Sequence, residues 1–272
     1  MLLLGLLVTS LAQSTEPPKD LPPPGAGPPA AGSEGARAPG AGFPGGPPEL
    51  PIWSVGAGAI VATRPYGGGR TRVVPIPVIR YQGERLTVEG PFARYRLAQW
   101  ENVRFTGLLR YRFDGYESDD GDVLDGMERD DTLDAGVRST IRLKGGTDIR
   151  LDAVTDLLGR HEGVEIGATI GRTFRTGSLF IVPEIGVQWQ SSNLADYYFG
   201  VRPEEARPGR PAYTTGSALN LEFGLTSRYL INRRTALVVV LRQRYLDESI
   251  TDSPIVDENF ITSFIVSLTY SL

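Results

Sequence analysis

The sequence offers few residues for catalysis. It contains one histidine, His161, and no cysteine, so cysteine nucleophiles, thiolate metal sites and disulfides are excluded. A serine hydrolase needs a histidine within hydrogen-bond reach of its nucleophile, and no motif around residues 159–163 singles out a serine partner. We therefore expect no enzymatic activity and no cofactor, and we interpret His161 as a solvated loop histidine.

An acidic segment between residues 114 and 131 has side chains that suit a hard cation. Asp119, Asp120 and Asp122 place carboxylates close together, and oxygen ligands of this kind bind Ca²⁺. The segment lacks the twelve-residue spacing and the bidentate glutamate of an EF-hand loop. We favour a solvated surface loop beside lipopolysaccharide phosphates and their divalent ions, and we keep these three residues as candidate ligands only.

Charged residues recur at alternate positions of apolar segments. On a strand such residues share one face, and the apolar residues share the other. A soluble sandwich would carry the charges on its outer surface, whereas a membrane barrel points them into its lumen. We favour a lumen filled by paired opposite charges over a small pore whose basic lining selects anions. The candidate lumen residues are Arg104, Arg110, Arg112, Arg138, Arg142, Glu165, Glu184, Glu222 and Arg228.

The apolar positions of these segments locate the strands. Near the end of the chain, Phe264, Val266, Leu268 and Tyr270 share one parity. Most such segments have about 10 to 13 residues, more than the ~5 or 6 of soluble sheets, and aromatic residues gather near their ends. The predicted strands are 53–63, 71–80, 84–89, 92–98, 103–113, 132–143, 148–158, 163–174, 179–190, 217–230, 235–246 and 259–272.

The connections between these strands alternate between tight turns and long loops. Outer-membrane barrels have this asymmetry, with short turns in the periplasm and long loops outside. We predict an all-β fold, a transmembrane antiparallel up-and-down β-barrel of 12 strands, with 10 as the alternative because the pair around residues 89–91 is short. The tight turns are 144–147, 175–178 and 231–234, and the long loops are 114–131, 191–216 and 247–258.

The first 51 residues differ in composition from the rest. Residues 1–12 have the short apolar core of a signal peptide, without its positively charged start. Residues 13–51 are rich in Pro and Gly and predict a disordered periplasmic linker ahead of a barrel over residues 52–272. No later run of 18 apolar residues occurs, which excludes a helical membrane protein, and the net charge of −4 argues against nucleic acid as a partner.

Segments of the long loops resemble the MipA/OmpV family of outer-membrane proteins. Residues 194–201 and 207–213 are similar to the family's YYGV…GLPAY loop, and residues 252–256 match its DSPIV segment. The resemblance spans about residues 53–272 and departs at Leu272, where the family has a terminal Phe that helps the barrel-assembly machinery recognise the strand. Shorter likenesses occur at 64–66, 74–77 and 124–127. The candidate contact residues of the family loops are Leu194, Ala195, Asp196, Tyr197, Tyr198, Phe199, Gly200, Val201, Pro211, Ala212, Tyr213, Asp252, Ser253 and Pro254.

The resemblance implies a place in the outer membrane of a Gram-negative bacterium. The family's namesake interacts with the lytic transglycosylase MltA, which implies a scaffolding role in the cell envelope and a link to murein hydrolases or synthases. A narrow porin-like channel or a surface adhesin is the alternative. Expected partners also include outer-membrane lipid, lipopolysaccharide and the barrel-assembly machinery. The aromatic residues of the 191–216 loop either fold back over the barrel mouth or form an exposed contact patch.

Overall fold

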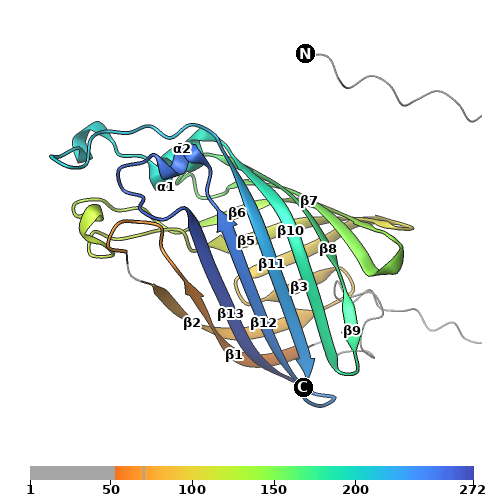
Figure 1. Cartoon of the computed structure of the whole chain (residues 1–272). Helices are drawn as coiled ribbons and strands as arrows, with labels where there is room; N and C mark the ends of the chain where they lie inside the picture. The colour runs from red at the N-terminus through yellow and green to blue at the C-terminus, as the bar shows by residue number, and fades with distance from the viewer. Residues whose placement is uncertain (1–52, 70) are drawn as a thin grey trace, which may run out of the picture. The chain divides into compact units, whose positions relative to one another are not determined.

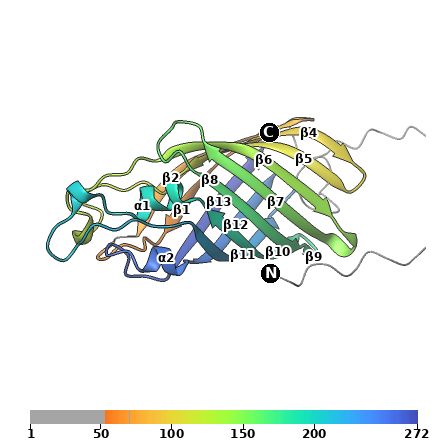
Figure 2. The ribbon, with the colours of Figure 1, turned by 90° about the horizontal axis from the view of Figure 1, so that it is seen from above.

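The computed structural model describes residues 53–69 and 71–272 as a closed antiparallel barrel with two short helices, α1 (Ser192–Phe199) and α2 (Glu248–Thr251) (Figures 1 and 2). The signal peptide and linker predicted for residues 1–12 and 13–51 lie outside these residues. The strands are β1 (Trp53–Ala62), β2 (Arg72–Gln82), β3 (Leu86–Glu89), β4 (Phe92–Trp100), β5 (Val103–Arg112), β6 (Thr132–Arg142), β7 (Thr147–Asp156), β8 (Val164–Arg172), β9 (Phe174–Thr176), β10 (Leu179–Gln190), β11 (Ala218–Leu230), β12 (Thr235–Tyr245) and β13 (Phe260–Ser271).

The wall has twelve strands, because β9 continues β8 after a break at Thr173 and both pair with β10. Neighbours in sequence pair antiparallel, and β13 returns to β1 with Ser271 opposite Ser54 and Ser263 opposite Ala62. The prediction of twelve strands is confirmed and the alternative of ten is wrong. The short segment that raised the doubt is real, since β3 has four residues and still pairs with both neighbours.

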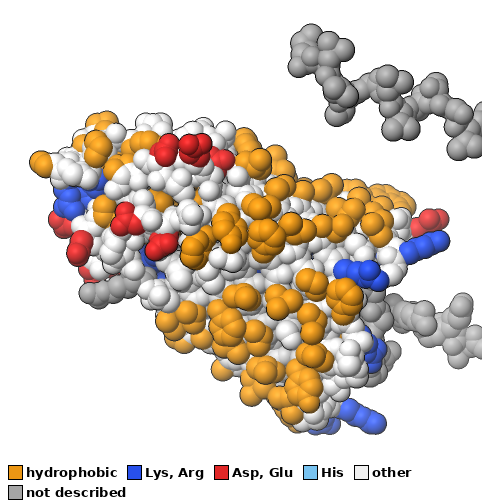
Figure 3. Space-filling view, in the orientation of Figure 1, with side chains coloured by type: hydrophobic (Ala, Val, Ile, Leu, Met, Phe, Trp, Pro, Cys, Tyr) orange, Lys and Arg blue, Asp and Glu red, His pale blue; other side chains and the backbone are white. Residues whose placement is uncertain are grey.

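The outer face of the wall is apolar. Leu97, Ile166 and Leu219 are 55%, 49% and 56% exposed, and Figure 3 shows hydrophobic side chains spread over the strands. Exposed apolar surface of this extent is unstable in water and suits lipid. Trp100 and Tyr229 lie at one end of the wall, as an interfacial aromatic girdle requires. Among the described residues, no helix has the length and apolarity needed to cross a membrane.

The two ends of the barrel differ. At one end the strands are joined by tight turns and the chain terminates, where the Leu272 N–H donates to the Trp53 carbonyl at 3.0 Å. The opposite end carries α1, α2 and the long connections (Figure 1). Short turns face the periplasm and long loops face outward in outer-membrane barrels, so α1 and α2 lie at the extracellular end.

The buried apolar core of the described residues lies in these long connections. We call it the cap. Its side chains come from loops that are far apart in sequence, and they pack together at the extracellular end, where the barrel mouth lies. The cap residues are Tyr66, Tyr116, Leu124, Met127, Leu194, Ala195, Tyr198, Phe199, Val201, Ala218, Ile250, Ile255 and Val256.

Candidate functional site: the extracellular cap and the charged lumen

Helix α1 forms the centre of the cap. Its apolar residues Leu194, Tyr198 and Phe199 are buried. The Tyr66 hydroxyl donates to the Tyr198 carbonyl at 3.2 Å, and the Ser253 hydroxyl donates to the Phe199 carbonyl at 2.6 Å. These bonds satisfy carbonyls at the C-terminal end of the helix, which lack partners within it. The two segments that resemble the MipA/OmpV family therefore meet in the cap.

The chain after α1 is held by backbone and side-chain bonds. Asp196 accepts from the Thr215 N–H at 2.8 Å, and Val201 and Tyr213 exchange backbone bonds at 2.8 and 2.9 Å. The Tyr213 hydroxyl donates to the Ser249 carbonyl in α2 at 2.8 Å. Of the other candidate contact residues, Pro211, Ala212 and Asp252 are exposed. The structure thus puts most of the aromatic loop residues inside the cap, and any contact role of the exposed ones stays a prediction.

Replacing Gly200 by alanine is expected to destabilise the cap by about 1–3 kcal/mol, because an added Cβ would collide with the Asp196 carboxylate and carbonyl. Limited proteolysis of the folded barrel should then cut within residues 191–216 more readily. Gly216→Ala in the same loop is the control, since its Cβ would meet nothing within 4 Å. Equal protease resistance in both variants would contradict the steric argument.

A bidentate ion pair fastens the acidic segment to the loop after α1. Arg129 donates to Glu205 at 2.7 and 2.8 Å, and its Nε donates to the Tyr197 carbonyl at 2.5 Å. Burial raises the pKa of Glu205, but the hydrogen bonds and charge of Arg129 outweigh burial, so this pKa lies below its usual value. Burial also raises the pKa of the adjacent Tyr116 to about 12. Glu205 is therefore charged and Tyr116 neutral at physiological pH.

Because the pKa of Glu205 is lowered by folding, its contribution to stability is present above the unfolded value of 4.5 and is lost as pH falls through the folded value. We expect the urea midpoint of the wild type to exceed that of Glu205→Gln at pH 7. The difference should shrink steadily as the pH is lowered below 4.5. A difference that stays constant from pH 7 to pH 3 would show that the carboxylate charge is not what stabilises this contact.

The candidate cation ligands do not converge on one point. Asp120 is paired with Arg64 at 2.6 Å and accepts from the Glu117 N–H at 2.8 Å. Asp119 and Asp122 border an open hollow of about 660 Å³. In the described part of the chain these three carboxylates do not form a group with ligand atoms close together. The role of the segment shown by its contacts is to pack the cap, and cation binding stays untested.

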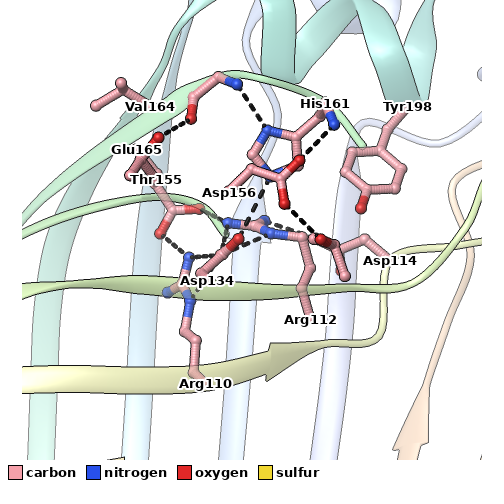
Figure 4. Close-up of polar contacts among 12 residues, drawn as sticks. Arg110, Arg112, Asp114, Asp134, Thr155, Asp156, His161, Val164, Glu165 and Tyr198 are labelled. Carbon is pink, nitrogen blue, oxygen red and sulfur yellow. Dashed lines mark hydrogen bonds and ion pairs between the residues drawn. The ribbon is translucent and has the colours of Figure 1, made fainter. Parts of the chain in front are cut away.

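His161 is not solvated, and this corrects the interpretation made from the sequence. It is 4% exposed, its Nε2 lies 3.3 Å from Asp134 Oδ1, and its Nδ1 accepts from the Gly163 N–H at 3.0 Å (Figure 4). With Nδ1 as an acceptor, the proton of the neutral ring sits on Nε2 and donates to Asp134. Asp156 causes the burial, because its Oδ2 accepts from the backbone N–H groups of His161 and Glu162 at 2.6 and 3.3 Å and turns the loop inward.

Beneath the cap, His161 joins a buried group of charges that we call the ionic cluster: Arg110, Arg112, Asp134 and Glu165 (Figure 4). Asp134 Oδ2 lies 3.0 Å from Arg110 and 2.7 Å from Arg112, and Glu165 lies 2.7 and 2.8 Å from the same two guanidiniums. Three strands, β5, β6 and β8, are thereby cross-linked near their extracellular ends. Of the candidate lumen residues, Arg110, Arg112 and Glu165 are thus brought together in this cluster.

The donor set of this region does not suit a metal ion. Asp134, Asp156 and His161 bring one ligand atom each within 4.8 Å of one another. The Nδ1 of His161 is occupied by the Gly163 N–H, and Asp134 already binds two guanidiniums and the imidazole. A cation placed here would have to compete with two positive charges, so the geometry is that of a structural network.

Most of the remaining candidate lumen residues pair outside the ionic cluster. Glu184 lies 2.6 Å from Arg150. Glu222 lies 3.6 and 3.7 Å from Arg242 and Arg244. Arg138 pairs with Asp152 at 2.5 Å, and Arg142 with Asp148 at 3.3 Å.

Some lumen arginines have no acidic partner. In the described part of the chain, Arg104 and Arg228 have no carboxylate within 4.0 Å, nor does Arg80, which the sequence reasoning missed. The alternation along β2 could have identified Arg80 as a lumen residue, because it shares the inward face of this strand with Val78. The lumen therefore carries surplus positive charge.

Comparisons with known proteins found a matching family model, curated relatives and solved structures. The family model described as "MltA-interacting protein MipA" matches residues 55–272. A "Putative outer membrane protein YiaT" of Escherichia coli K12 is 28% identical over 221 residues, 80% of this chain and 89% of the relative. The "MltA-interacting protein" of the same strain is 29% identical over 224 residues, with the same coverage. Among solved structures, an outer membrane channel of Pseudomonas putida F1 aligns with 84% of this chain and 99% of its own, at a TM-score of 0.44 and 16% identity.

Proposed function

Since the chain belongs to the MltA-interacting protein family and is an outer-membrane β-barrel of a Gram-negative bacterium, we propose that it is a capped, non-enzymatic scaffold for murein-processing enzymes. In this role the barrel anchors a partner at its periplasmic end. Lipopolysaccharide, lipid and the barrel-assembly machinery would be its other contacts.

The observation that carries this proposal is the packing of the cap and the ionic cluster at the extracellular end. A general porin keeps a water-filled mouth, whereas here Tyr198 and Asp134 are 2% and 0% exposed across that end. The family segments contribute to this packing through contacts such as Ser253 to Phe199. These family segments lie in extracellular loops, which does not by itself fit a periplasmic scaffold. Their packing in the cap accounts for this position.

The periplasmic end has the charge to hold a partner. Its tight turns expose basic residues, which we call the basic rim: Arg85, Lys144, Arg175, Arg233 and Arg234. Only Glu84 and Glu101 oppose them in the described turns. Such a rim favours a partner with an acidic face by electrostatic complementarity. The relative named MltA-interacting protein supports a murein-processing enzyme as that partner.

The test is capture of murein hydrolases from detergent-solubilised envelopes by the full-length protein. We expect recovery with the wild type and loss of recovery in Lys144→Ser/Arg233→Ser/Arg234→Ser. The matched control is Pro211→Ser/Ala212→Ser at the opposite end, which should capture as much as the wild type. A chain lacking residues 16–51 tests the N-terminal segment in the same assay. Recovery of no murein enzyme with the wild type would overturn the scaffold.

A narrow channel is the second candidate, and the surplus of lumen arginines favours it. Arg80, Arg104 and Arg228 lack carboxylate partners in the described residues, so a path through this barrel would prefer anions. Steady anion-selective openings of the wild type in planar bilayers would favour the channel over the closed scaffold.

A further inference from the structure

One side of the lumen is apolar, although the inner face of a membrane barrel is normally polar. On β1 and β2 the odd positions face lipid, as the 42% and 61% exposure of Val55 and Val73 shows, so the even positions face inward. On β12 the exposed Leu241 likewise puts the odd positions outward, whereas on β13 the exposed Leu268 puts the even positions outward and the odd positions inward. The inward side chains form what we call the apolar strip: Ile60, Val74, Ile76, Val78, Val238, Val240 and Ile265.

The strip is continuous across four strands. Ile60 lies opposite Val74 on one side and opposite Ile265 on the other, and Ile265 lies opposite Val240. Gly58 and Ser267 occupy the two positions between Ile76 and Val238, so the inward side chains there are small. No long side chain therefore stands between the larger apolar residues of the strip.

Two buried arginines lie at the periplasmic end of the strip. Arg80 follows Val78 on the same face of β2, and Arg228 lies opposite Val238. They are 8% and 4% exposed, and the Nε of each is buried without a hydrogen-bond partner. Among the described residues neither has a carboxylate within 4.0 Å, because the nearby Glu89 pairs with Arg94 at 3.2 Å. Two buried guanidiniums without a carboxylate partner are costly, so they favour an anionic ligand on this side of the lumen.

The wall beside the strip has an unpaired edge. β3 pairs only with Arg80–Gln82, so among the described strands none pairs with the earlier part of β2 on the side away from β1. The Ile79 carbonyl faces this side, since it accepts from the Gly90 N–H at 3.1 Å. Pro75 and Pro77 are also odd positions of β2, so their backbone nitrogens face the same edge as the Ile79 carbonyl. Proline has no backbone N–H, so these two positions present no unpaired donor there. The absence of these two N–H donors lowers the free-energy cost of an unpaired strand edge in lipid, and the edge of β2 next to the strip stays unpaired.

We propose that this side of the lumen binds an anionic amphiphile, with its head on Arg80 and Arg228 and its alkyl chain along the apolar strip. Guanidiniums bind carboxylate and phosphate in bidentate fashion, and either head meets the requirement. From Arg80 to Val74 the strand rises by about 20 Å, which accommodates a long single chain. The unpaired edge of β2 gives the ligand access from the outer membrane itself, so the extracellular cap need not open. This binding site is independent of the scaffold role.

The test is binding of tritiated hexadecanoate and hexadecyl phosphate to the full-length protein in a neutral detergent. We expect saturable binding of at least one, and the preferred head distinguishes a carboxylate from a phosphate ligand. Hexadecanol, which lacks the charge, and acetate, which lacks the chain, should bind at least about tenfold more weakly. In Arg80→Gln/Arg228→Gln the affinity for the anionic probe should fall about tenfold or more. This variant should fold, because it removes uncompensated buried charge.

Arg242→Gln is the matched control, since Arg242 is an inward arginine of β12 that lies 3.6 Å from Glu222. Arg242→Gln should bind hexadecanoate with the affinity of the wild type. Ile76→Ser should lower the affinity for hexadecanoate more than the affinity for acetate. Equal affinity for hexadecanol and hexadecanoate, or undiminished binding in Arg80→Gln/Arg228→Gln, would overturn the proposal. Murein-enzyme capture by the same variants separates this outcome from failure of the scaffold.

Discussion

Replacing Asp134 by alanine is expected to lower the free energy of unfolding by about 3–5 kcal/mol, because it leaves buried charges uncompensated. Asp134 is fully buried and contacts Arg110, Arg112 and His161. Without it, Arg110 is left with Glu165, Arg112 is left with Glu165 and the exposed Asp114, and the Nε2 proton of His161 loses its acceptor. Strands β5 and β6 would then lose the ion pairs to Asp134 that link them close to the cap.

Urea unfolding of the barrel in lipid vesicles, followed by the heat-dependent shift of the folded band on a gel, measures this loss. Glu222→Ala is the matched control, because Glu222 is also an inward carboxylate between two arginines but lies 3.6 and 3.7 Å from them. It should cost no more than about 1 kcal/mol. Arg112→Met/Asp134→Met, which removes a charge of each sign, should cost less than Asp134→Ala. Equal losses in Asp134→Ala and Glu222→Ala would contradict the ionic cluster as a lock.

The wall was predictable from the sequence because period-two alternation is a local property. On β13 the exposed Leu268 alternates with the inward Ser267 and Thr269, and a shift of one residue would expose the polar side to lipid. Register is therefore strongly determined by the pattern. Even β3, with four residues, lies within the predicted strand 84–89.

The cap and the lumen contacts were harder to predict from the sequence, because the alternation of apolar and polar residues stops where a strand ends. Nothing local to His161 indicates that the loop turns inward, since the turn depends on Asp156 collecting backbone N–H groups across it. The bond from Ser253 to Phe199 joins residues 54 positions apart, and no pattern encodes it. Which lumen charges pair depends on the stagger between strands, so the sequence suggests an inward Arg228 but not that its buried Nε lacks a hydrogen-bond partner.

Removing the cap is expected to convert a closed barrel into a conducting one. Gln190 and Ala218 are opposite partners in β10 and β11, so residues 191–217 can be deleted and replaced by a two-residue Asn-Gly turn without straining the wall. The deletion takes away α1 and with it the buried Leu194, Tyr198 and Phe199. We expect no steady openings of the wild type in planar bilayers and steady openings of the deletion variant.

The openings should favour anions, because the lumen keeps Arg80, Arg104 and Arg228 without carboxylate partners in the described chain. Adding Arg104→Gln to the deletion should reduce that preference and leave the openings themselves. Pro211→Ser/Ala212→Ser, which changes only exposed residues of the same loop, should stay closed. Steady current through the wild type would refute closure by the cap. A silent deletion variant would assign closure to the ionic cluster, which the Asp134→Ala change in the same background would then open.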